Sequence, residues 1–341
     1  MKIGISIGDL AGIGPEVLLK ALARPLGEDV GVVVYGARDA LERENGLLGQ
    51  AAWGEADFQE TFVAADGPEA VTADGSVGVV DVCPDLTTAD IPKGEPDERA
   101  ARLQQAAFER AVADARREAI DAVCTAPWNK SLFGLIDEPC VGHTDVLDDT
   151  FKATEPVMML AGPQLRVSLV TTHLPLRRVP DRLTSAKLEH VIKTTVGGLS
   201  NRFGIEHPTV AVCGLTPHAG GGGVMGEEEQ KLIEPTLEEL QERLESSVDL
   251  RGPFPSDTLF AKFRDGQSPF DAVVAMYHDQ GLIPLKLMHF GQSANVTLGL
   301  PLIRTSVDHG TAYDIAGQGV ADAGSMRYAL ELAVDMARRG S

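Results

Sequence analysis

DAVVAMYHDQGLIPLKLMHFGQSANVTLGLPLIRTSVDHGTAYDIAGQG, residues 271–319, is the stretch that decides the fold of this chain. Its opening apolar run, residues 272–276, has the length and composition of a buried parallel strand. The run leads directly into YHDQ, residues 277–280, which places polar side chains at the carboxyl end of the strand. Because open α/β sheets bind ligands at the carboxyl ends of their strands, we expect an α/β fold with a site at this edge.

Polar side chains continue through the rest of this stretch, on what we expect to be glycine-punctuated loops between apolar runs. A buried polar group needs a hydrogen-bonding partner, so a set this dense is better explained by a functional site than by packing. The side chains concerned are Lys286, Asn295, Arg304, Asp308, His309 and Asp314.

Strands and helices alternate over the rest of the chain. The expected strands are residues 2–7, 30–35, 77–82, 122–125, 157–160, 165–170 and 209–214. The expected helices are residues 15–22, 37–44, 98–119, 184–199 and 227–244, the last kinked or split by Pro235. Residues 51–76 show no pattern that assigns them. The alternation predicts an α/β chain with two lobes and a cleft between them.

Composition narrows the class of protein. The chain has 341 residues, 43% of them hydrophobic, and a formal net charge of −20. So acidic a chain argues against binding nucleic acid or an anionic membrane, and an anionic substrate would need a locally positive site. No apolar run is long enough to span a membrane, and the N-terminus is unlike a secretory leader, so we expect a cytoplasmic protein. The scattered cysteines form no CxxC pair, which indicates reduced thiols: Cys83, Cys124, Cys140 and Cys213.

A glycine-rich turn near the N-terminus invites comparison with a dinucleotide-binding fingerprint. Residues 8–16 read GDLAGIGPE, between an expected strand and an expected helix. The third glycine of the fingerprint would fall at position 17, which is Val17, and no acidic residue clearly ends a second strand. An ordinary Rossmann site is therefore disfavoured.

Several separated motifs occur in a recognisable order along nearly the whole chain. They are GDLAGIGPE, GHTD (142–145), TTHLPL (171–176), PHAGGGG (217–223), YHDQG (277–281), NVTLGLP (295–301) and IRTSVDHGTAYDIAG (303–317). Together they resemble the 4-hydroxythreonine-4-phosphate dehydrogenase family, whose fold is related to isocitrate and isopropylmalate dehydrogenases. The resemblance implies a first lobe of residues 1–127 plus 291–341, on the side of the cofactor loop. Residues 128–290 would form the second lobe, on the side of the metal and the dimer.

Three histidines follow the ends of three expected strands, at His173, His218 and His278. Their spacing leaves open whether they converge, because none belongs to an HxxxH or HxH pair, and a single histidine is more often structural. The resemblance implies that they bind a divalent metal and that a homodimer shares the ligands. Imidazole favours zinc, while magnesium, manganese, cobalt and nickel stay open. Asp279 and Asp257 are candidate partners or proton acceptors, although Asp257 also fits the start of a helix.

Further roles follow only from the resemblance. It implies that an anionic substrate is bound by His143, Thr144, Lys286, Asn295 and Arg304, with Lys286 also a catalytic candidate. Without the resemblance, simple capping of a helix by Thr144 would be the favoured explanation of that segment. The loop containing His309, Gly310 and Asp314 resembles an adenosine-binding loop. Asp314 could accept hydrogen bonds from ribose hydroxyls, which favours NAD over NADP.

The implied reaction is metal-assisted, NAD-dependent oxidation of a secondary alcohol in a phosphorylated hydroxy acid, followed by decarboxylation. Relatives in this family are thought to use 4-hydroxythreonine phosphate, 4-phospho-threonate or erythronate, or aromatic cis-dihydrodiol carboxylates. The chain departs from the family pattern at Leu10, where proline is usual, and at Gly221, where glutamate is usual. An acyltransferase like phosphate acetyltransferase, which needs no nicotinamide, remains an alternative from another class.

Overall fold

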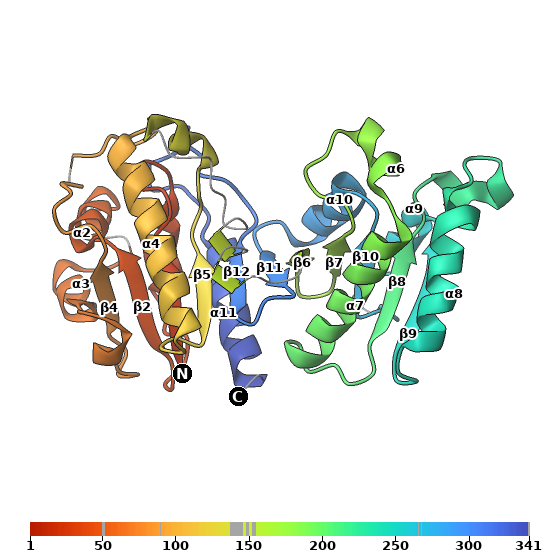
Figure 1. Ribbon diagram of the computed structural model, residues 1–341. Coiled ribbons are helices and arrows are strands. Elements are labelled where there is room, and N and C mark those ends of the chain that lie inside the picture. Colours follow the sequence, from red (N-terminus) through yellow and green to blue (C-terminus); the bar gives the residue numbers. More distant parts are fainter. Residues whose placement is uncertain are drawn as a thin grey trace. The chain divides into compact units, whose positions relative to one another are not determined.

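The computed structural model describes residues 1–49, 52–88, 90–136, 146–147, 150–151, 155–264, 266 and 268–339. The chain has a mixed α/β fold that divides into two compact units (Figure 1). Unit 1 consists of Met1–Thr154 with Leu300–Arg339, and unit 2 of Glu155–Gly299. The lobe boundaries expected from the sequence lie after residues 127 and 290, and the roles given to those lobes stay a prediction.

Unit 1 is built on a parallel sheet with the strand order β3-β4-β2-β1-β5-β12. The strands are β1 (Lys2–Ser6), β2 (Gly31–Gly36), β3 (Phe62–Ala64), β4 (Val77–Asp81), β5 (Ala122–Thr125) and β12 (Ile303–Val307). Every residue of β2, β5 and β12 is buried. A parallel sheet reads as continuous apolar runs because helices cover both of its faces.

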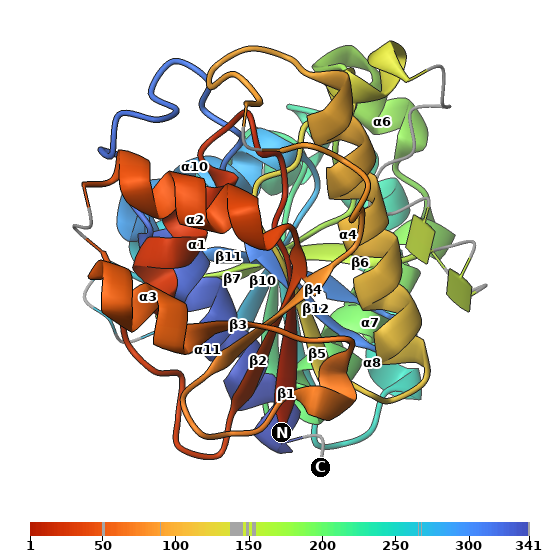
Figure 2. The same ribbon diagram turned by 90° about the vertical axis from the view of Figure 1, so that its left-hand side faces the viewer.

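Helices pack on both faces of this sheet, α4 on one and α1, α2 and α11 on the other (Figure 2). The helices of unit 1 are α1 (Gly14–Leu22), α2 (Arg38–Leu47), α3 (Glu55–Thr61), α4 (Glu98–Arg116) and α11 (Gly324–Arg339), with short 3₁₀ turns at η1 (Pro68–Ala70) and η2 (Lys130–Leu135). The unassigned residues 51–76 contain α3, β3 and η1. These elements are short, so neither a helical nor a strand period has room to show.

Unit 2 has a mixed sheet with the order β11-β6-β7-β10-β8-β9. Its strands are β6 (Val157–Ala161), β7 (Arg166–Leu169), β8 (Thr209–Cys213), β9 (Asp249–Phe254), β10 (Ala272–Ala275) and β11 (Ala294–Leu298). The pairs β7–β10, β10–β8 and β8–β9 are parallel, whereas β6 pairs antiparallel with both β7 and β11. Helix α7 lies on one face and α10 on the other (Figure 1).

The helices of unit 2 are α6 (Val179–Arg182), α7 (Ser185–Asn201), α8 (Glu234–Arg243), α9 (Ser256–Ala261) and α10 (His278–His289); its short turns are η3 (Leu176–Arg178) and η4 (Pro217–Gly223). The helix expected over residues 227–244 is split, as Pro235 led us to expect. A π-helical turn, η5 (Glu229–Ile233), precedes α8, and Pro235 lies at the start of α8. Proline is tolerated there because a first-turn residue needs no intrahelical N–H donor.

The structure corrects one expectation about the deciding stretch. Lys286, Asn295 and Arg304 lie in α10, β11 and β12, not on loops. Helix α10 contains both Gly281 and Pro284, which weaken a helical prediction from sequence. The loop expected around His309 and Asp314 does follow β12. No helix within the described ranges is long and apolar enough to cross a membrane.

Candidate functional site at the carboxyl ends of the strands

His173 and His278 come together beyond the ends of β7 and β10. These strands pair in parallel, with Val273 opposite Val167, so their carboxyl ends lie at the same edge. The two imidazole ring centroids are 5.7 Å apart. Thr171 fixes the two strand ends, since its N–H and its Oγ1 both donate to the Met276 carbonyl, at 3.2 and 2.7 Å. The structure thus brings two of the three predicted metal ligands side by side.

Asp279 fixes the orientation of the His278 ring. Oδ1 of Asp279 lies 2.7 Å from Nδ1 of His278 at the start of α10. A carboxylate on one ring nitrogen holds the imidazole and leaves Nε2 for another partner, as in histidines that ligate metals. A negative charge in the first turn of a helix is also favourable to the helix dipole. Asp279 is therefore placed to orient the histidine.

His218 lies in an unusual left-handed loop after β8. The backbone φ is positive at His218 (57°), Ala219 (48°) and the four glycines 220–223. A non-glycine residue in this region costs about 1–2 kcal/mol, so the loop needs support from its surroundings. Gly221 has a φ of +52°, a conformation that glycine adopts without steric cost.

Glu229 provides that support from the π-helical turn. Its side chain is fully buried, and Oε1 accepts hydrogen bonds from the N–H groups of Leu215 and Thr216, both at 2.8 Å. The Thr216 hydroxyl also donates to Glu229 Oε2 at 2.9 Å. A Cβ on Gly220 would lie 2.9 Å from Glu229 Oε2, so only glycine leaves room for the carboxylate.

His218 is on the loop next to the paired histidines, because β8 pairs with β10. Within the described part of the chain, no three His, Cys, Asp or Glu side chains gather closely enough to hold a metal. Asp257 is exposed at the second position of α9, whose N-cap is Pro255. Lys286 is half-buried in α10, and Asn295 half-buried in β11. His143 and Thr144 lie outside the described residues.

In unit 1, Arg304 is buried at the second position of β12, which pairs with β5. Its Nη2 donates to the hydroxyl of Thr125, at the end of β5, at 2.9 Å. Burial lowers the pKa of Arg304 to about 10, so the guanidinium is still a cation at neutral pH. In an acidic chain, this buried cation is the kind of local positive charge that an anionic ligand requires.

The loop of residues 308–319, which we call the closing loop, is anchored to the turn that follows β1. The hydroxyl of Tyr313 donates to Asp9 Oδ2 at 2.5 Å, and Asn129 Nδ2 donates to the same hydroxyl at 2.8 Å. The Ile13 N–H donates to the Thr311 carbonyl at 3.0 Å. Asp9, Asn129 and Tyr313 were not identified from the sequence. The available signal was their polarity, since all three follow strands of the parallel sheet.

Burial shapes the chemistry of this contact. Asp9 is fully buried, and this burial raises the pKa of its carboxyl group, an effect that the hydrogen bond from Tyr313 opposes. Burial and the Asp9 carboxylate in turn raise the pKa of the Tyr313 hydroxyl. Gly12 is needed for close approach of the closing loop, because a Cβ there would lie 2.7 Å from the Thr311 carbonyl oxygen. The N-terminal glycine motif therefore serves a contact between two loops.

The predicted cofactor residues lie on the closing loop. Asp314 is exposed, and its carbonyl accepts a hydrogen bond from Gln318 Nε2 at 2.8 Å. His309 is half-buried, with Nδ1 2.9 Å from the carbonyl oxygen of the exposed Gly310. An exposed carboxylate on an anchored loop is available to hydroxyl donors of a ligand.

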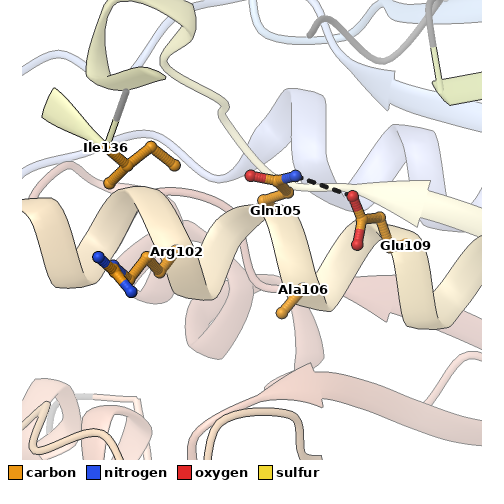
Figure 3. A pocket seen from close by; sticks show the side chains of 5 residues that line it. All are labelled: Arg102, Gln105, Ala106, Glu109 and Ile136. Carbon is orange, nitrogen blue, oxygen red and sulfur yellow. Dashed lines mark hydrogen bonds between the residues drawn. The ribbon is translucent and has the colours of Figure 1, made fainter. Parts of the chain in front are cut away.

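Two surface hollows of unit 1 lie elsewhere. One of about 180 Å³ runs along α4, lined by Arg102, Gln105, Ala106, Glu109 and Ile136 (Figure 3). Another of about 680 Å³ includes Met1, Lys2 and Gly31, at the amino ends of β1 and β2. None of the predicted site residues lines either hollow, so the strand-end groups remain the candidate site.

The fold and the strand-end groups define an α/β protein with candidate metal ligands in one unit and a candidate nucleotide loop in the other. Residues 28–333 match the family model described as pyridoxal phosphate biosynthetic protein PdxA. The chain belongs to this family, which confirms the resemblance found in the sequence motifs.

Among curated relatives, the 4-hydroxythreonine-4-phosphate dehydrogenase of Desulfosudis oleivorans is 44% identical over 98% of this chain and 96% of its own length. The crystal structure of 4-hydroxythreonine-4-phosphate dehydrogenase from Klebsiella pneumoniae has a TM-score of 0.82 and 38% identity, covering 98% of this chain and 99% of that one. A terephthalate 1,2-cis-dihydrodiol dehydrogenase from Burkholderia xenovorans LB400 is more distant, with a TM-score of 0.64 and 26% identity over 98% of both chains.

Proposed function

We propose that this protein is an NAD-dependent dehydrogenase that oxidises a secondary alcohol of a phosphorylated hydroxy acid resembling 4-hydroxythreonine 4-phosphate, with subsequent decarboxylation. The observation that carries the proposal is the pairing of the His173 and His278 rings, 5.7 Å apart, in a chain of the PdxA family. The dehydrogenase names of the relatives support the reaction class. We further propose an isocitrate/isopropylmalate dehydrogenase-like two-lobed fold and a cytoplasmic location.

The donor groups fit a divalent metal. Two neutral imidazoles suit zinc best, with magnesium, manganese, cobalt and nickel as alternatives, and the bond from Asp279 leaves the Nε2 of His278 for the metal. His218 would supply the third imidazole. A bound metal would lower the pKa of the substrate hydroxyl and stabilise negative charge that develops on the substrate oxygen. Asp279 and Asp257 are the candidate proton acceptors, and Lys286 is a further catalytic candidate that would add a positive charge.

A homodimer that shares the metal ligands is supported by an exposed apolar stripe on α10. Ile283, Leu287 and Phe290, at the end of this helix, are 65%, 86% and 82% exposed. Ile283 and Leu287 are four residues apart, so they lie on one face of the helix, and Phe290 follows at its C-cap. Large apolar side chains gathered on a surface mark interaction sites, and this helix also begins with His278. A second copy on this stripe would bring its own loops close to the paired histidines.

The proposed substrate class rests on the charged and polar side chains of the site and on the names of the related proteins. Arg304, Lys286 and Asn295, with His143 and Thr144, are proposed to hold its phosphate and carboxylate groups. A second candidate substrate is an aromatic cis-dihydrodiol carboxylate, which the relative from Burkholderia xenovorans favours. 4-Phospho-threonate or phospho-erythronate would undergo the same chemistry. No described contact favours the acyltransferase alternative.

The nicotinamide cofactor gives the most direct test. We expect saturable binding of NAD by the wild-type protein and a loss of at least tenfold in affinity for Asp314→Ala, because the ribose would lose its acceptor. Asp85→Ala, which removes an exposed carboxylate of unit 1 outside the closing loop, serves as the matched control. NAD-dependent turnover of a panel of phosphorylated hydroxy acids and dihydrodiols then identifies the substrate. Absence of NAD binding, with acyl transfer from acetyl phosphate, would refute the dehydrogenase.

A further inference from the structure

A single buried glutamine joins the loops of unit 2 that carry the candidate site. Gln280, 9% exposed, donates from Nε2 to the Gly214 carbonyl at 2.6 Å and to the Ser256 hydroxyl at 2.8 Å. Its Oε1 accepts a hydrogen bond from the Met276 N–H at 2.6 Å. Both amide protons and the amide oxygen are therefore used, each by a different segment of the chain.

Each partner of Gln280 is close in sequence to a candidate functional residue. Ser256 directly precedes Asp257, and Met276 lies two residues before His278. Gly214 begins the segment that leads to His218. One side chain thus bonds to three separate strand-end segments and sets the distances between them.

The backbone at Gly214, which accepts from this amide, and at Gly281, which follows Gln280, is closely packed. A Cβ on Gly214 would lie 2.9 Å from the Cα of Ala219 and 3.1 Å from Glu229 Oε1, so this backbone is already enclosed on its other side. A Cβ on Gly281 would lie 2.5 Å from Val167 Cγ1, so glycine is what allows α10 to approach β7 closely. Bonds between buried groups in such confined space hold their partners in one arrangement.

We propose that Gln280 is a positioning residue for the metal centre, because it fixes the placement of the loops bearing His218, Asp257 and His278 relative to one another. The inference rests on the proposed function, since it assumes that these histidines bind a metal. Glutamate would retain only acceptors and would face the Gly214 carbonyl with another oxygen. Methionine would keep the volume and remove all three bonds, which makes Gln280→Met the informative variant.

Gln104 offers a matched control in unit 1. It is fully buried, and its amide donates to the Asn129 carbonyl at 2.9 Å and accepts from the Asn129 N–H at 3.2 Å. Gln104→Met therefore removes a comparable set of bonds to the backbone, but none to a segment that carries a candidate metal ligand. Loss of stability alone would appear in both variants.

The experiment measures metal binding by the full-length protein without substrate. Metal-free wild type, Gln280→Met and Gln104→Met are titrated with zinc against a competing chelator, and thermal unfolding of each is recorded. We expect Gln280→Met to bind zinc about 10–100-fold more weakly, as is usual when a group that orients metal ligands is removed, and Gln104→Met to bind it as the wild type does. Cobalt absorption spectra, which report ligand geometry, should change for Gln280→Met alone.

Each other outcome has a definite meaning. Wild-type zinc affinity and cobalt spectrum in folded Gln280→Met would overturn the inference, as would equal weakening in Gln104→Met. If Gln280→Met does not fold, Ser256→Ala replaces it. That variant removes one of the three bonds, and an unchanged zinc affinity and cobalt spectrum would likewise overturn the inference. If the wild type binds no metal, or His278→Ala binds it equally well, the proposed function fails first, independently of Gln280.

Discussion

The hydroxyl of Tyr313 donates a hydrogen bond to the buried carboxylate of Asp9, joining two residues that are 304 positions apart in the chain. Asn129 donates to the same hydroxyl, so loops that follow β1, β5 and β12 meet at one phenol. The closing loop, which carries Asp314, is therefore anchored to the loops at the carboxyl ends of β1 and β5. This contact has consequences for both stability and nucleotide binding.

Tyr313→Phe tests the contact. The variant leaves Asp9 buried without its phenol donor, so the pKa of Asp9 should rise further and the free energy of unfolding should fall by about 1.5–3 kcal/mol. Affinity for NAD, measured by fluorescence titration, should weaken because the closing loop is less restrained. Tyr35 donates a similar bond to the buried Asp114 at 2.9 Å, away from this loop. Tyr35→Phe should lose stability but bind NAD normally, and equal NAD affinities in both variants would contradict the role of the anchor.

Gly220→Ala tests the support of the His218 loop. Alanine there must adopt a φ of +82° and would also press its Cβ against Glu229 Oε2, so the loop must shift. Gly222→Ala is the matched control, because its φ is +71° but nothing lies within 4 Å of the added Cβ. Chemical denaturation should show a loss of about 1–2 kcal/mol for Gly222→Ala and a larger loss for Gly220→Ala. Only Gly220→Ala should also weaken zinc binding. Equal losses would show that Glu229 moves aside freely.

His289 should make the stability of the protein depend on pH. The side chain is 5% exposed and packs where a Cβ on Gly162 would lie 2.5 Å from its ring, and burial lowers its pKa. A base whose folded pKa is lowered contributes stability that is present above the unfolded value, 6.5, and lost as pH falls through the folded pKa. One such proton changes the free energy of unfolding by at most about 1.4 kcal/mol per pH unit.

Urea denaturation of wild type and His289→Gln between pH 7.5 and 5.5 measures this effect. We expect the wild type to lose stability faster than the variant below pH 6.5. His207→Gln, at an exposed position, should follow the wild type. Parallel pH profiles for wild type and His289→Gln would exclude His289 as the source.

Leu287→Glu tests the apolar stripe of α10. The side chain is 86% exposed, so a charge there should not disturb the fold of a monomer. If a second copy covers this face, sedimentation velocity should show the variant shifted toward monomer and zinc binding should weaken with it. Leu47→Glu, at a 47% exposed position of α2, should sediment as the wild type does. An unchanged sedimentation coefficient for Leu287→Glu would place the interface elsewhere.

The parallel strands and the residues at their ends were accessible from the sequence. The apolar run before YHDQ forms β10, and the strands that precede His173 and His218 lie beside it. The rings of His173 and His278 lie side by side, which the spacing of the histidines had left open. Short apolar runs bounded by polar residues identify buried strands well, because a strand that is buried on both faces has apolar residues at nearly every position. That the three imidazoles bind one shared metal stays a prediction.

The features that could not be predicted from the sequence depend on tertiary contacts. Helix α10 overrides the weak helical propensity of Gly281 and Pro284, because its buried side chains Leu282 and Leu285 pack into the core of unit 2. The bond from Tyr313 to Asp9 depends on how two distant loops fold back, and no local period reports that. The same holds for Gln280, whose partners come from three segments. Polar side chains that satisfy one another inside a fold leave only their polarity in the sequence.

Unit 1 is assembled from two separate pieces of chain, and this imposes an order on its formation. Its strand β12 pairs with β5, and α11 packs against both, yet these last pieces are synthesised only after Glu155–Gly299. During translation, β5 therefore has one unpaired edge and an uncovered apolar face until β12 and α11 are made. Unpaired strand edges and exposed apolar surface promote aggregation with other nascent chains. A chain truncated before residue 300 would keep this edge and this face exposed, so we expect it to aggregate.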